Sequence, residues 1–212
     1  MRRGILLGWI FGAGSLLAAC TTISSHYYSL ADLPALEAAP VVSAGKASYG
    51  LQVQVLGVPA EVDRSQLLVR DPARGPAVEV LNQSLWAAPL VDQIQALLAG
   101  RVSADLGAPD VRRLPGLTDL PIRQMQVRVT RFDLVWGQGA DLAATWTDRM
   151  PEARESRICQ AQVRVAAAQG VAALVDAQRQ ALQVLAGLMA RQGTSANPGS
   201  PDSQVSVQSG CT

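Results

Sequence analysis

The sequence predicts an α/β fold in which two long amphipathic helices pack on a mixed, mainly antiparallel sheet. Six or seven segments alternate apolar and polar residues with a period of two, as half-buried strands do. Residues 85–106 and 171–189 instead repeat apolar residues at helical spacing. The chain has 212 residues, 49% of them hydrophobic, which is enough for an ordinary core without a metal or disulfide scaffold.

The first strand signals lie before residue 82. Four segments are predicted as strands: residues 27–30, 51–55, 67–70 and 77–81. In the second of them, Leu51, Val53 and Val55 share one face, and Gly57 and Pro59 end the strand. The third and fourth segments flank the turn sequence DPARGP, so we expect them to form an antiparallel hairpin.

The first helix is expected after this hairpin, where the apolar period changes from two to that of a helix. One helical face carries the apolar residues Leu85, Leu90, Ile94, Leu97, Leu98, Val102 and Leu106. Ser84 suits the N-cap position, and Gly107 is expected to end the helix. Pro89 is tolerated only in the first turn, so we expect the regular helix to begin near Ala87 or Ala88.

A long strand is predicted at residues 122–136, and its alternation changes parity. The apolar residues before the change are Met125, Val127 and Val129, and those after it are Phe132, Leu134 and Trp136. Alternation cannot switch without an extra residue, so we predict a bulge near Thr130 and Arg131. Residues 142–146 and 157–167 also alternate, which predicts three long consecutive antiparallel strands.

The chain divides into four parts. Residues 1–19 form a leader, and residues 20–48 contain the short first strand followed by a loop rich in alanine, proline and serine. Residues 49–192 are expected to form the α/β domain, whose second helix is stopped by Gly193. Residues 193–212 form a tail rich in proline, glycine and serine, which we expect to be disordered up to Cys211.

The leader has the pattern of a secretory signal peptide: a positive start, an apolar run and two alanines before Cys20. The sequence LAAC resembles the bacterial lipobox, in which the cysteine becomes the new amino terminus and carries diacylglycerol and an N-acyl chain. We therefore expect Cys20 to anchor the chain, since two or more acyl chains hold a protein stably at a membrane. An uncleaved membrane anchor with a chance cysteine is the alternative.

Thr21 and Thr22 follow the lipidation site. In lipoproteins of double-membrane bacteria, an aspartate at this place usually causes retention in the inner membrane. By likeness to that class, the threonines indicate a chain anchored to the periplasmic face of the outer membrane.

Cys159 and Cys211 remain as an even pair in an oxidising compartment. A disulfide between them would tie the end of the tail to the domain, with a chain-entropy stabilisation of about 4 kcal/mol. Two free thiols are the alternative.

Several classes of function find no support in the residues. The net charge of +1 without a basic block argues against a nucleic-acid binder. His26 is the single histidine, and neither CxxC nor HExxH occurs, so we expect neither a metal nor another cofactor beyond the lipid on Cys20. Without GxSxG or a histidine base in the body of the chain, we expect no enzyme.

The acidic side chains could be assembled into a catalytic pair, but solvated acids are the preferred interpretation. The candidates lie at predicted strand ends and turns: Asp133, Asp141, Asp148, Glu152 and Glu155. Trp86 is expected to open the first helix, and a core position beneath the hairpin is preferred to ligand contact.

The order of several short motifs resembles the PqiC-type auxiliary lipoproteins of ABC-type transport systems. A lipobox and YYSL come first, and a Val-Pro, a spacer and an Asp-Arg then introduce a strand that carries an arginine. The matching positions are Val58-Pro59, Asp63-Arg64 and Arg70. The tryptophan before the helix is matched by Trp86-Ala87-Ala88-Pro89-Leu90, without the usual acidic residue. The Arg-Phe of the long strand is Arg131-Phe132. The likeness extends over residues 27–188, and neither the tail nor the two late cysteines belong to its motifs.

This resemblance implies a non-catalytic, lipid-anchored periplasmic subunit that docks an MCE-domain protein and its ABC permease and ATPase in lipid transport between membranes. It also implies a ring of identical subunits. Trp86, Arg64, Arg70 and Arg131 are then candidates for an interaction surface. The competing hypothesis is a periplasmic lipoprotein that scaffolds envelope assembly or binds a small amphiphile.

Overall fold

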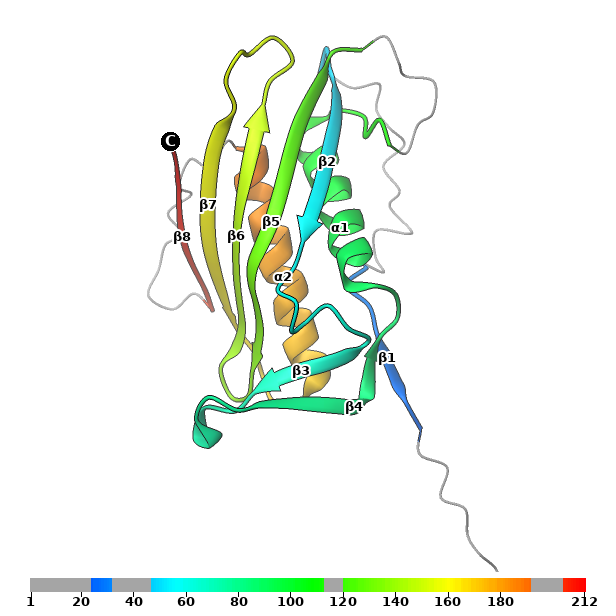
Figure 1. The fold of residues 1–212 in the computed structure, drawn as a ribbon, viewed down its shortest axis with the longest axis vertical. Helices are drawn as coiled ribbons and strands as arrows, with labels where there is room; N and C mark the ends of the chain where they lie inside the picture. Colours follow the sequence, from blue (N-terminus) through cyan, green and yellow to red (C-terminus); the bar gives the residue numbers. More distant parts are fainter. Residues whose placement is uncertain (1–23, 32–46, 113–119, 192–203) are drawn as a thin grey trace, which may run out of the picture.

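The described part of the chain forms one mixed sheet of eight strands, with two helices on one of its faces (Figure 1). The computed structural model describes residues 24–31, 47–112, 120–191 and 204–212. The elements are β1 (His26–Tyr28), β2 (Gly50–Gly57), β3 (Gln66–Arg70), β4 (Val78–Trp86), α1 (Leu90–Leu106), β5 (Ile122–Val135), β6 (Gly139–Arg149), β7 (Arg157–Ala166), α2 (Val171–Ala190) and β8 (Val205–Cys211). The fold class predicted from the sequence is confirmed.

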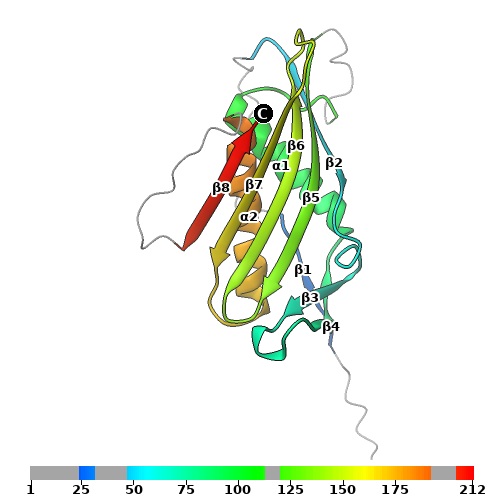
Figure 2. The ribbon, with the colours of Figure 1, turned by 60° about the vertical axis from the view of Figure 1, so that its left-hand side comes forward.

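The three long strands β5, β6 and β7 form the centre of the sheet and follow one another in antiparallel order, as predicted. The strand order is β1-β4-β3-β5-β6-β7-β8, and β2 lies parallel to β5. The predicted β3–β4 hairpin is also confirmed. It meets β5 through a single residue pair, Arg70 and Val135, and lies across the lower end of the long strands (Figure 1, Figure 2).

The predicted bulge in β5 is present. The register of β5 against β6 shifts between Val129 and Arg131, so Thr130 is the extra residue. Thr130 and Arg131 are both exposed, whereas Phe132 is buried on the same face as Val129. One extra residue therefore keeps the apolar residues of both halves of β5 directed at the helices.

The predicted start of the first helix is wrong. α1 begins at Leu90, with Pro89 before it, and Ser84 is not its N-cap. Ser84 belongs to β4 and pairs with His26 of β1, so the strand continues as far as Trp86. Pro89 disfavours helical backbone in the residue before it, while residues 84–86 gain strand partners in β1. The predicted helix end is correct, because Gly107 takes the left-handed conformation with φ of 60°.

An ion pair is buried on the inner face of the sheet. Arg123 and Asp148 are 2% and 4% exposed, and Arg123 Nε and Nη2 donate to the two carboxylate oxygens of Asp148 over 2.9 and 2.6 Å. Burial opposes the charge on Arg123, but the bonds to Asp148 and to the Tyr49 hydroxyl outweigh it and raise the pKa of Arg123. The expectation that Asp148 is a solvated acid is therefore wrong.

The last part of the chain is not a disordered tail. Residues 205–211 form β8, which pairs with β7 along seven residue pairs. Cys211 lies opposite Cys159, and the two are joined by a disulfide. Gly193 and the proline-rich stretch up to residue 203 lie outside the described residues. Only two valines alternate in this short strand, which is too weak a signal for a sequence-based prediction.

Replacing Asp148 with Asn should lower the free energy of unfolding by about 3–5 kcal/mol, because Arg123 would stay buried without its counter-ion. Urea denaturation of both proteins measures the loss. Asp176→Asn is the control, since Asp176 pairs with Arg179 at the surface and should lose less than about 1 kcal/mol. Equal losses in the two variants would contradict the structural role of the buried pair.

Candidate interaction surface

Arg70, at the end of β3, binds two acidic side chains. Its Nε donates to Asp133 Oδ1 over 2.8 Å, and its Nη2 donates to Glu61 Oε1 over 2.8 Å. Asp133 belongs to β5, and Glu61 belongs to the segment between β2 and β3. Arg70 therefore connects both this segment and the β3–β4 hairpin to β5. The hydrogen bond to Asp133 is the main cause that raises the pKa of Arg70 above its usual value.

Arg131 extends this arrangement towards β6 and β7. Its Nη1 donates to Asp141 Oδ2 over 3.0 Å, and its Nε lies 3.9 Å from Asp133 Oδ2. Asp141 also accepts from Arg164 Nε over 3.2 Å and from Gln162 Nε2 over 2.9 Å. Burial alone would raise the pKa of Asp141, but the donors on Gln162 and the two arginines outweigh that cost and hold the pKa below its usual value.

These six side chains form a continuous series of ion pairs that we call the charged row: Glu61, Arg70, Asp133, Arg131, Asp141 and Arg164. Asp133 and Asp141 each bridge two arginines. Three acids and three arginines balance, so the row carries no net charge. The row fixes the position of side chains across β3, β5, β6 and β7 and leaves little free charge to attract an ionic ligand.

A hollow of about 380 Å³ opens at one end of the charged row. Its lining residues are Pro59, Glu61, Arg70, Thr130, Arg131, Phe132 and Asp133. The β5 bulge forms one wall, because Thr130 and Arg131 both face outward there. The guanidinium groups in the hollow are already bonded to carboxylates, so the arrangement suits contact with a protein surface better than capture of a small anion.

Two exposed valines lie beside the hollow. Val78 pairs with Arg70 across the hairpin, and Val80 pairs with Leu68. Val78 is 42% exposed and Val80 is 36% exposed. Exposed aliphatic groups next to ordered polar groups are the composition of a protein interface with an apolar centre and a polar rim.

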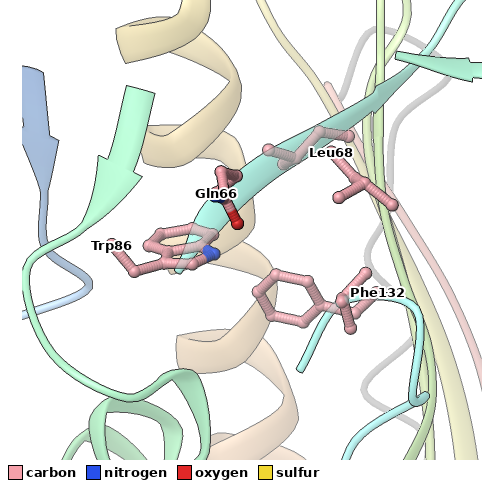
Figure 3. A pocket seen from close by; sticks show the side chains of 6 residues that line it. Gln66, Leu68, Trp86 and Phe132 are labelled. Carbon is pink, nitrogen blue, oxygen red and sulfur yellow. The ribbon is translucent and has the colours of Figure 1, made fainter. Parts of the chain in front are cut away.

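Trp86 does not open the first helix and does not lie on the surface. It is the last residue of β4, is 6% exposed and meets Phe132 edge-to-face with ring centroids 6.1 Å apart (Figure 3). The cavity that both rings share with Gln66 and Leu68 has a volume of about 10 Å³, which admits a single water molecule. Trp86 is therefore a core residue that supports the hollow from beneath, through Phe132.

Arg64 stands apart from the charged row. Its side chain is exposed and makes no ion pair with another described residue, while its backbone nitrogen donates to Val62 in a tight turn. The structure thus joins Arg70 and Arg131 through Asp133, places Trp86 below them and leaves Arg64 outside the network.

Cys20, the predicted lipidation site, lies outside the described residues. His26, six positions later, is exposed in β1. Across the described ranges, no three His, Cys, Asp or Glu side chains gather as metal ligands, and no helix is long and apolar enough to cross a membrane.

Several residues of this surface were not singled out from the sequence. Glu61 is one, because nothing in a loop sequence indicates its distant partner. Val78 and Val80 are others, because their alternation in a hairpin normally marks a buried face. Asp133 and Asp141 did carry a signal: they are equidistant from Gly137, which sets them opposite one another in a hairpin.

The chain belongs to the family of ABC-type transport auxiliary lipoprotein components, whose family model matches residues 28–190. The match extends from the end of β1 to the end of α2, includes Cys159 and ends before Cys211. The family resemblance seen in the sequence is therefore confirmed. No curated protein matches this sequence.

Two solved structures are similar in fold. One is the crystal structure of an uncharacterized protein, with a TM-score of 0.60 and 18% sequence identity. The matched region covers 80% of this chain and 98% of the chain in that structure. The other is the crystal structure of protein XCC0632 from Xanthomonas campestris, which is assigned to the family model DUF330. Its TM-score is 0.52 and its sequence identity is 18%, and the matched region covers 71% of this chain and 90% of the chain in that structure. At these identities the likeness concerns the fold alone.

Asp141→Asn should destabilise the protein by about 1–2 kcal/mol at pH 7, because the charge-assisted bonds from the arginines are lost. The pKa of Asp141 is lowered on folding, so its contribution is present above the unfolded pKa of about 3.9 and disappears as the pH falls below that value. Unfolding curves of both proteins at pH 7 and pH 3 measure the difference. A difference that stays constant across this range would contradict the charged role of Asp141.

Proposed function

We propose that the chain is an outer-membrane-anchored periplasmic lipoprotein that serves as a non-catalytic auxiliary subunit of an MCE/ABC-type lipid transport system between membranes. The family match over residues 28–190 carries this proposal, since it spans the fold from β1 to α2. The family defines an auxiliary lipoprotein of an ABC-type transporter, and the outer membrane and the MCE partner are our more specific inferences.

The anchor is assigned to Cys20, which would carry diacylglycerol and an N-acyl chain as the only non-protein groups. LAAC supports lipidation, and Thr21 supports transfer to the periplasmic face of the outer membrane. The disulfide between Cys159 and Cys211 agrees with an oxidising compartment, because such bonds are rare where thiols are kept reduced.

The hollow and the two valines beside it are our candidate for the surface that docks the MCE-domain protein, with the ABC permease and ATPase as the more distant partners. Several copies of the chain in a ring would present this surface repeatedly. The charged row supports the assignment, because it fixes the polar groups in place before binding and so lowers the entropic cost of association.

Amphiphile binding by the chain itself is less well supported. The cavity between Trp86 and Phe132 has a volume of about 10 Å³, which is far below what an acyl chain requires. The hollow of about 380 Å³ is lined mostly by charged and polar groups, which an acyl chain would have to desolvate.

Val78→Glu should reduce co-purification of the MCE protein and the ABC ATPase at least tenfold, because it places a charge among the apolar contacts. The measurement is a pulldown of the tagged, lipidated chain from solubilised envelopes, quantified against the wild type. Met150→Glu is the matched control, since Met150 is 37% exposed in the turn after β6 and should keep both partners. A stoichiometric bound lipid without either partner would instead favour the amphiphile-binding lipoprotein.

Cys20→Ser should remove the chain from the outer-membrane fraction, because serine cannot form the thioether and the leader is not processed. Membrane fractionation and the mass of the mature chain measure this. Outer-membrane fractionation unchanged from the wild type would falsify the anchor.

A further inference from the structure

The backbone of β8 offers hydrogen-bonding groups at the edge of the sheet. Ile158 and Thr212 exchange both backbone hydrogen bonds, with N···O distances of 3.2 and 2.9 Å. In an antiparallel ladder, such bonded pairs alternate with non-bonded ones, so Gly210 and Gln208 also bond to β7. Val207 and Ser209 lie in the alternate positions, and their N–H and C=O groups therefore point away from β7.

The opposite side of the sheet shows how this chain covers a strand edge. Gln95, a side chain of α1, accepts from Val55 N over 2.7 Å and donates to Val53 O over 2.6 Å. Further along β2, Leu51 N bonds to Pro109 O over 2.8 Å. The outward backbone groups of β2 are thus bonded by a helix side chain and a loop.

Within its own sequence, β8 lacks the charges, prolines and bulges by which edge strands normally avoid pairing with another chain. Residues 204–212 have the sequence QVSVQSGCT, which contains no charged residue and no proline. The register with β7 is regular from Val205 to Cys211, without a bulge. The strand is seven residues long, whereas β1, at another edge, has only three. β8 is therefore a straight, neutral edge.

The disulfide fixes this edge in place. Cys211 is covalently bound to Cys159 of β7, so β8 cannot leave the sheet to be exchanged for the same strand of another copy. An incoming strand can then only add to the outside of β8. The family match ends at residue 190, so this locked edge lies beyond the part shared with the family model.

We propose that β8 is a self-association edge, at which the β8 strand of a second copy of this chain adds in antiparallel orientation. The neutral sequence supports a second copy as the occupant, because two like strands meet without charge repulsion. Antiparallel addition also presents the same edge on both sides, which gives a closed two-fold pair. Val207 and Ser209 of each copy then donate and accept backbone bonds across the interface. This pairing does not depend on the proposed transport role.

The test uses the lipidated chain in detergent micelles and compares three substitutions. Val207→Pro removes an outward N–H that bonds to no other described residue, and proline is tolerated at such an edge position. Val207→Ala is the matched control, because it trims the side chain and keeps the N–H. Gln208→Lys is a second edge variant. It adds like charges near the middle of two paired antiparallel β8 strands, and the fold of each copy should be unaffected because Gln208 is exposed.

Analytical ultracentrifugation should show that the mass of the assembly doubles with concentration for the wild type and Val207→Ala, whether single chains or rings of the chain pair through β8. Val207→Pro and Gln208→Lys should each raise the dissociation constant at least about tenfold, since bonds are lost or charges opposed in both copies. Amide hydrogen exchange at Val207 and Ser209 should slow as the wild-type concentration rises. A mass that stays constant at all concentrations would overturn the proposal, and so would association that both edge variants leave unchanged.

Discussion

The extra residue in β5 is the constraint on which the rest of the molecule depends. Without Thr130, the strand beyond it would turn Phe132 towards solvent and bury Asp133 against the helices. With it, the lower half of β5 completes the apolar layer that holds Trp86, while its outer face supplies the acid that binds Arg70 and Arg131. The single inserted residue therefore determines both the packing of the core around Phe132 and the position of Asp133 in the charged row.

The sequence predicted the features that are set by neighbouring residues and missed those that depend on residues far away along the chain. The bulge was predictable because a change of parity within one strand has one cause. The start of α1 was not, because Ser84 suits both an N-cap and a strand, and only the distant residue His26 decides between them. Asp148 looked like a solvated acid because its partner Arg123 is 25 positions earlier.

The surface was predictable only in part, for the same reason. Arg70 and Arg131 were singled out, but the row that joins them depends on Glu61 and Asp133 from two other segments. Trp86 was placed in the core correctly, and its ring contact with Phe132 explains why a tryptophan matters there. The resulting architecture is an ordered outer surface over a cavity the size of one water molecule, which agrees with the docking role proposed above.

β1 connects the proposed anchor to the fold. The chain that follows Cys20 enters the sheet at His26, runs parallel to the last residues of β4 and ends in Leu30, which is fully buried and whose backbone nitrogen bonds to Gln93 of α1 (Figure 1). With the proposed lipid on Cys20, a pull on the anchor would load β1 and its partner β4 first, because β1 pairs with β4 and not with the long strands β5, β6 and β7.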